Sequence, residues 1–108
     1  MVRTELTIAD CRRAVQVYHR ILKRDMLGST RIDRVAQPRQ MAMTLARELT
    51  GKSLPRIGEE FGDRDHSTVL HGIQTVEKRR TASVGYGMEY EGLRLTLAVY
   101  AAQKARWP

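Results

Sequence analysis

The chain has 108 residues, the size of one ordinary domain. Hydrophobic residues make up 42% and charged residues 29% of the sequence, a balance typical of a folded soluble protein and not of a disordered tail or a membrane protein. Nineteen Lys and Arg residues against twelve Asp and Glu residues give a formal net charge of +7, so the surface attracts polyanions such as nucleic acid or anionic lipid.

The single cysteine, Cys11, excludes an intrachain disulfide and leaves no Cys/His cluster for structural zinc. No apolar stretch is long enough to span a membrane, and the polar residues 1–10 lack the hydrophobic region of a signal peptide. We therefore expect a cytoplasmic protein without cofactor, metal or small-molecule substrate. Because the chain begins at Met1 and carries no visible tag, a complete small protein is favoured, with an excised domain as the alternative.

The N-terminal part of the sequence predicts two helical segments and a loop. Thr7 and Asp10 form the pattern of a capping box, and apolar residues at helical spacing then predict a helix over about 8–22. Residues 23–27 predict a short helical turn, which Gly28 ends in a left-handed conformation before a basic loop.

Prolines and glycines mark the next two helices. Pro38 suits the first turn of a helix that ends at Gly51. Ser53 is a good cap for a shorter helix that has Pro55 in its first turn and ends at Gly62. The apolar stripes of these helices are Met41, Leu45 and Leu49 in the longer one and Leu54, Ile57 and Phe61 in the shorter one.

Asp65 is a good N-cap for a helix over 66–80, and its short link to the preceding helix predicts a helix-turn-helix. Residues 81–87 predict a linker, and a last helix follows over about 88–105. The sequence thus predicts an all-α fold of about five or six helices. We expect residues 1–80 to form the helix-turn-helix region and residues 81–108 to form an extension packed on the same domain.

The helix over 66–80 has an outward face that suits the major groove of DNA. Val69, Ile73 and Val76 share its inward face. The outward residues are small and polar instead of charged, they offer hydrogen bonds, and Gly72 is expected to allow close approach. The outward and flanking residues are Ser67, Thr68, His71, Gln74 and Thr75. Upstream cations expected to neutralise phosphates are Arg31, Arg34, Arg39, Arg47, Lys52 and Arg56.

Three blocks of sequence carry a resemblance to a known family. They are QPRQMAMTLARELT at 37–50, SLPRIGEEFG at 53–62 and RDHSTVLHG at 64–72. In order and spacing they resemble the C-terminal DNA-binding domain of the bacterial replication initiator DnaA, over about residues 7–80. The resemblance implies binding to asymmetric DnaA boxes of the TTATCCACA type, with a recognition helix in the major groove and an arginine in the adjacent minor groove.

The resemblance also implies roles for individual residues. By position, base contacts fall to Asp65, His66 and Ser67 in the major groove and to Arg31 in the minor groove. Asp63 stands where the family often has a second glycine, and its charge beside the DNA predicts a shifted box preference. The residues expected at the DNA backbone or the groove wall are Arg39, Gln40, Arg47, Lys52, Pro55, Thr68 and His71.

Several residues also have simpler interpretations. Asp65, His66 and Ser67 are the residue types of a hydrolytic triad, but neighbours on a helix diverge by about 100°, so no enzyme is expected. The spacing of His66 and His71 is unfavourable for a shared metal. Arg31 has a solvated loop arginine as its alternative. We expect Cys11, Met41 and Met43 in or beside the core.

The last predicted helix has more apolar surface than one docking face needs. Leu93, Leu97 and Tyr100 define one face, and Leu95, Val99 and Ala102 lie roughly opposite. The second face predicts a homodimer, with burial inside the monomer as the alternative.

The sequence leads to two hypotheses about function. The first is a sequence-specific, nucleoid-associated DNA-binding module acting in replication or transcription. The second is an interaction protein that assembles through its last helix and binds DNA without specificity.

Overall fold

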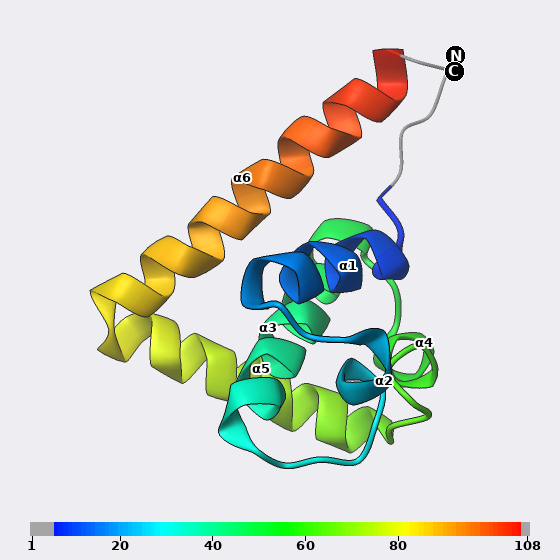
Figure 1. Ribbon diagram of the computed structural model, residues 1–108, viewed down its shortest axis with the longest axis vertical. Coiled ribbons are helices and arrows are strands. Elements are labelled where there is room, and N and C mark those ends of the chain that lie inside the picture. The colour runs from blue at the N-terminus through cyan, green and yellow to red at the C-terminus, as the bar shows by residue number, and fades with distance from the viewer. Residues whose placement is uncertain (1–5, 107–108) are drawn as a thin grey trace.

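The computed structural model describes residues 6–106, which form six helices and no strand (Figure 1). This confirms the predicted all-α fold. The helices are α1 (Ile8–His19), α2 (Lys23–Met26), α3 (Asp33–Thr50), α4 (Leu54–Glu59), α5 (His66–Ala82) and α6 (Val84–Arg106).

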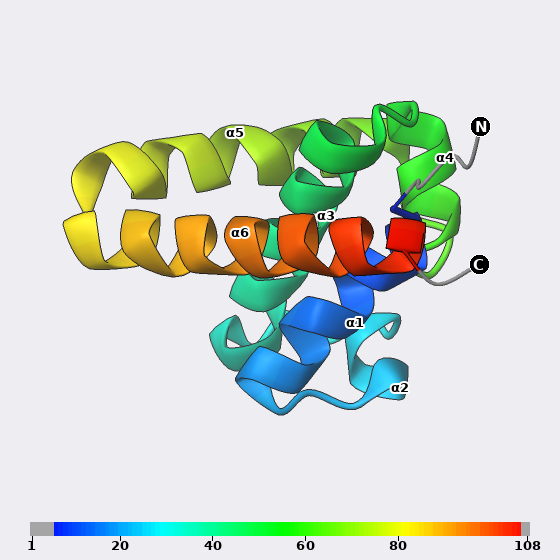
Figure 2. The ribbon, with the colours of Figure 1, turned by 90° about the horizontal axis from the view of Figure 1, so that it is seen from above.

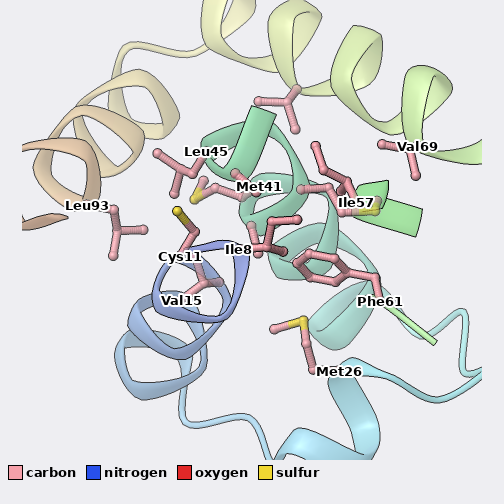
Figure 3. Close-up of a cluster of buried hydrophobic side chains, with 14 of the residues drawn as sticks. Ile8, Cys11, Val15, Met26, Met41, Leu45, Ile57, Phe61, Val69 and Leu93 are labelled. Carbon is pink, nitrogen blue, oxygen red and sulfur yellow. The ribbon is translucent and has the colours of Figure 1, made fainter. Parts of the chain in front are cut away.

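Helix α3 is the centre of the structure, and α1 and α5 pack against it. Every residue from Met41 to Ala46 in α3 is buried, because neighbouring helices cover this stretch on all sides. Cys11, Met41 and Met43 lie in the core as predicted, and burial raises the pKa of the Cys11 thiol to about 12. Figure 3 shows part of this core, including Val15, Met26, Leu45, Ile57, Phe61, Val69 and Leu93.

The capping box at the start of α1 is present, but the helix ends earlier than predicted. The Asp10 N–H donates to Thr7 Oγ1 at 3.0 Å, and the Thr7 N–H donates to Asp10 Oδ2 at 2.9 Å. Helix α1 ends at His19, because Arg20 adopts a left-handed conformation with φ of 56° and the Ile21 N–H returns to the Gln16 carbonyl at 2.8 Å. This turn buries Ile21 outside the helix.

Two predictions around the basic loop are wrong. Gly28 is not left-handed; among the described residues, positive φ belongs to Arg20, Gly51, Gly62 and Asp63. Helix α3 begins at Asp33, so Pro38 lies inside it and not in its first turn. Proline near the beginning of a long helix removes one backbone hydrogen bond, and burial of Pro38 against the core offsets part of that cost.

The predicted linker over 81–87 is also wrong. Helix α5 continues to Ala82, α6 begins at Val84, and Ser83 alone is extended, with φ of −135° and ψ of 117°. The Ser83 hydroxyl accepts from the Tyr86 N–H at 3.1 Å, which caps α6 and offsets the weak helix propensity of the glycines that follow. One capped residue therefore replaces the loop.

Helix α6 packs back on the body of the domain, between α5 and α1 in Figure 2. Tyr90, Leu93 and Leu97 are buried, whereas Tyr100, expected on the same face, is exposed. The Tyr90 hydroxyl donates to Glu48 Oε1 on α3 at 2.7 Å, and Lys104 Nζ donates to Asp10 Oδ2 on α1 at 3.0 Å. Apolar contacts and these two polar contacts hold α6 in place.

Candidate nucleic-acid interface

The first turn of α5 presents the three residues predicted to contact bases. Asp65 is the N-cap, and its Oδ2 accepts from the Ser67 N–H at 2.9 Å and from the Ser67 hydroxyl. These hydrogen bonds, the side-chain one first, lower the pKa of Asp65, so its carboxylate is charged at neutral pH. Asp65 Oδ1 lies 3.6 Å from His66 Nδ1.

The same turn is open to solvent. The Asp65 and His66 side chains are each 63% exposed, and Ser67 and Thr68 are exposed as well. The Ser67 hydroxyl donates to Asp65 and not to His66, so the order of contacts differs from that of a hydrolytic triad. The turn offers a carboxylate, an imidazole and hydroxyl groups to an approaching ligand.

The rest of α5 separates an outward polar face from an inward apolar face. Val69 and Val76 are fully buried, and His71 is exposed. Gly72 has a different role from the one expected. It is buried against α3, where a Cβ atom would lie 3.1 Å from Met43 Cε and 3.3 Å from Gln40 Cγ. Gly72 therefore allows the close packing of α5 on α3 and not a close approach of DNA.

An open groove runs beside this turn, between the segment 27–31, α3 and α5. In Figure 1 the segment joining α2 to α3 lies at the same lower edge of the molecule as the beginning of α5. The predicted site residues that line the groove are Arg31, Arg39, Gln40, Thr68 and His71. The other lining residues are Leu27, Gly28, Ser29, Thr30, Ala36, Met43, Gly62 and Arg64.

Arg39 lines the groove but is only 5% exposed. Its Nε donates to the Met26 carbonyl at 2.7 Å, its Nη1 to the Thr30 carbonyl at 3.0 Å and its Nη2 to the Asp25 carbonyl at 2.8 Å. Burial, and then the nearby charge of Arg64, lowers the pKa of Arg39 to about 10, so the guanidinium stays protonated at neutral pH. This geometry favours support of the loop over the phosphate contact expected for Arg39.

Gln40 lies in the groove, and the other predicted backbone contacts lie where α3 leads into α4. Gln40 connects α3 to α5, because its Oε1 accepts from Arg79 Nη1 at 2.6 Å. Arg47 is exposed at the end of α3 and donates from Nη1 to the Lys52 carbonyl at 2.6 Å. Lys52 and Pro55 are exposed near the beginning of α4 and do not line the groove. The structure therefore divides the predicted backbone contacts into a groove set and a separate α3–α4 set.

The sequence pattern does not indicate a role for Arg64. Its guanidinium donates to the carbonyls of Phe61, in the turn before α5, and of Gly28, in the basic loop. Burial lowers the pKa of Arg64. Arg64 lies in the RDHSTVLHG block, but its partners are backbone carbonyls. Every residue has such a carbonyl, so the pattern of residue types does not predict these contacts.

Residues 6–106 contain no group of three or more His, Cys, Asp or Glu side chains placed to hold a metal ion. Over the same residues, no helix is both long and apolar enough to cross a membrane.

Helices α4 and α5 are consecutive and in contact, and comparison with known proteins identifies them as part of a helix-turn-helix domain. The family described as bacterial dnaA protein helix-turn-helix matches residues 8–76, from the start of α1 into α5. The chromosomal replication initiator protein DnaA of Sphingopyxis alaskensis is 45% identical over 95 residues, which are 88% of this chain and 21% of that protein.

Two further relatives carry the same name. DnaA of Neisseria meningitidis serogroup C is 48% identical over 84 residues, and DnaA of Limosilactobacillus reuteri is 46% identical over 77 residues. These matches cover 78% and 71% of this chain, but 16% and 18% of the two relatives. The chain thus spans about a fifth of the curated relatives that it matches, and it belongs to the family of bacterial DnaA helix-turn-helix domains.

Proposed function

We propose that the chain binds double-stranded DNA and recognises DnaA-box-like sequences, with no chemical step of its own. The observation that carries this proposal is the exposed first turn of α5 beside a groove lined by arginines. Binding at such sites would let the chain act in replication initiation, in its regulation or in transcription.

The first turn of α5 has the dimensions and chemistry of a base-reading element. Residues 65–68 rise by only about 5 Å along the helix axis, so they reach neighbouring base pairs together. Asp65 accepts hydrogen bonds, and a carboxylate suits the amino group of cytosine. His66 adds a polar ring edge, and Ser67 adds a hydroxyl. We assign the base contacts in the major groove to these three residues and the minor-groove contact to Arg31.

The phosphate contacts supply affinity without sequence information. Within the groove we assign them to Gln40 on α3 and to Thr68 and His71 on α5, which line it. Outside it we assign them to Arg47 and the neighbouring Lys52 and Pro55, all exposed where α3 leads into α4. The net charge of +7 favours the approach of DNA in general.

A fluorescence-anisotropy titration at fixed salt tests this function, with a DnaA-box duplex, a scrambled duplex of equal composition and a single strand as ligands. Each mismatched base pair costs about 1 to 3 kcal/mol, so scrambling several positions should weaken binding by about a hundredfold or more. Equal affinity for the two duplexes would leave non-specific DNA binding, and absence of binding would refute the proposal.

A second proposal concerns assembly with another copy of the chain. Met88, Leu95 and Val99 on α6 are 70%, 52% and 58% exposed, on the face opposite the buried residues of that helix. With Gly92 and Ala102 they follow the alternating spacing of three and four residues found at the seam of two-stranded coiled coils. We propose that two copies pair through this face.

A further inference from the structure

We propose that Arg39 and Arg64 are positioning residues that hold the 27–31 loop, and with it Arg31, at a fixed distance from the first turn of α5. This inference rests on the proposed function, because the fixed distance would match the spacing of the minor-groove and major-groove contacts on one DNA site. Neither arginine needs to touch a base to affect recognition.

Arg39 closes the loop at both ends. It donates to the Asp25 and Met26 carbonyls at the end of α2 and to the Thr30 carbonyl directly before Arg31. The Asp25 carbonyl also accepts from the Gly28 N–H at 3.2 Å. The Met26 carbonyl ends the short helix, where carbonyls lack partners within the helix, so the buried guanidinium satisfies a group that would otherwise be costly to bury. Releasing the fork would free the Thr30 end of the loop.

Arg64 fastens the same loop to the helix-turn-helix. One guanidinium donates both to the Phe61 carbonyl and to the Gly28 carbonyl, which belong to the turn and to the loop. The backbones also meet directly: a Cβ atom on Gly62, where φ is +81°, would lie 2.1 Å from the Leu27 carbonyl oxygen. The loop is therefore seated on the turn that leads into α5.

The two arginines complete a continuous path between the proposed DNA contacts. Arg64 directly precedes Asp65, the N-cap of α5, and Arg39 holds the carbonyl of the residue that precedes Arg31. Both arginines are also among the residues that line the groove. A preorganised loop binds more tightly than a mobile one, because its ordering cost is met during folding and not during binding.

The test uses Arg39→Gln, Arg39→Lys and Arg64→Gln in the full chain, each alone and combined with Arg31→Ala or with His66→Ala. Lysine keeps the charge but lacks the planar fork that reaches three carbonyls. Arg12→Gln is the matched control. Arg12 is also a buried arginine, but its Nη1 donates at 2.7 Å to Gln16 within α1.

We expect each of the three loop variants to bind the box duplex about fivefold more weakly or worse, the fold-change of one lost base contact. In a protein that already carries Arg31→Ala, the loop variants should cause little further loss of affinity for the box duplex, because they act through Arg31. In a protein that carries His66→Ala, they should cause the full loss of affinity. Amide hydrogen exchange of residues 27–31 should become faster in these variants and stay unchanged in Arg12→Gln.

Two results would overturn the inference. One is Arg39→Lys with wild-type affinity and wild-type exchange, which would make Arg39 a simple phosphate-binding charge. The other is full additivity of Arg39→Gln with Arg31→Ala. If only this inference fails, the wild-type protein still prefers the box duplex over the scrambled duplex. If the wild-type protein shows no such preference, the proposed function is refuted, and the positioning role is refuted with it.

Discussion

His66 is the residue on which the proposed base reading depends most directly. Its side chain is 63% exposed and lies beside the charged N-cap Asp65. We expect His66→Ala to weaken binding to the box duplex by about 1 to 3 kcal/mol and binding to a scrambled duplex much less. Anisotropy titrations of both duplexes measure the difference.

Thr81→Ala, in the last turn of α5, is the control for His66→Ala, because Thr81 is exposed and far along the same helix from the proposed contact. Equal losses on the two duplexes would reassign His66 to folding or to phosphate binding.

Arg47 tests the phosphate contacts separately from base reading. Its guanidinium is exposed and held by the Lys52 carbonyl. Arg47→Ala should weaken all duplexes alike, and the slope of log affinity against log salt should become shallower by about 1. Arg106→Ala, an exposed change at the far end of α6, should leave the slope as it is. An unchanged slope in Arg47→Ala would make Arg47 an ordinary surface charge.

Single residues were predictable from the sequence where their partners are close in the chain. Asp65 caps α5 as expected, because capping uses backbone groups within the next turn. The loop contacts of Arg39 and Arg64 were not, because the carbonyl partners of Arg39 are 13, 9 and 14 residues away and the Gly28 carbonyl is 36 residues from Arg64, although the Phe61 carbonyl is three residues from it. A carbonyl is the same for every residue type, so the sequence contains no sign of these contacts.

At the scale of elements, Asp10 connects the start of α1 to the end of α6. Burial raises the pKa of Asp10. Hydrogen bonds from Thr7 and Lys104 and the charge of Lys104 together lower the pKa by more than burial raises it, so the net pKa is below the ordinary 3.8. A carboxylate with a lowered pKa in the folded state stabilises the fold at pH values above its pKa in the unfolded chain. This stabilisation is lost as the pH falls below about 4.

We expect Asp10→Asn to lower the free energy of unfolding at pH 7 by about 1 to 3 kcal/mol, because a charged hydrogen-bonding partner is lost. Its stability should also fall less than that of the wild type between pH 4 and pH 2. Urea unfolding followed by circular dichroism measures both effects. Asp33→Asn, at an exposed position, is the control. Parallel pH curves for Asp10→Asn and wild type would contradict this role.

The types of the elements could be predicted more fully than their boundaries. Apolar periodicity over many residues defines α1, α3 and α5, and local caps define their beginnings where a capping side chain exists. Helix α3 begins without one, since its N-cap Ile32 makes no side-chain cap, so no capping pattern in the sequence marks its start at Asp33. The glycines after Ser83 predict a longer break than the structure has, because they adopt helix once Tyr90 and Leu93 anchor α6 on the core.

At the scale of the whole molecule, the outward face of α6 predicts self-association. Light scattering at high micromolar concentration should give the mass of a dimer. Leu95→Asp/Val99→Asp should dissociate it, because two charges would be buried at the seam, while helical circular dichroism stays intact. Thr96→Asp, an exposed change beside the seam, is the control. The dimer proposal would be refuted if the wild-type protein has the mass of a monomer and the double variant has the same mass.

The central claim is that one surface, formed by the first turn of α5 and the 27–31 loop, reads the DNA. The most direct test is a titration of isotope-labelled protein with the box duplex, followed by backbone amide chemical shifts. We expect the largest changes at Arg31, at residues 66–68 and at His71, with little change at Leu95 and Val99 on α6. Changes centred on α6, or an identical pattern with the scrambled duplex, would contradict it.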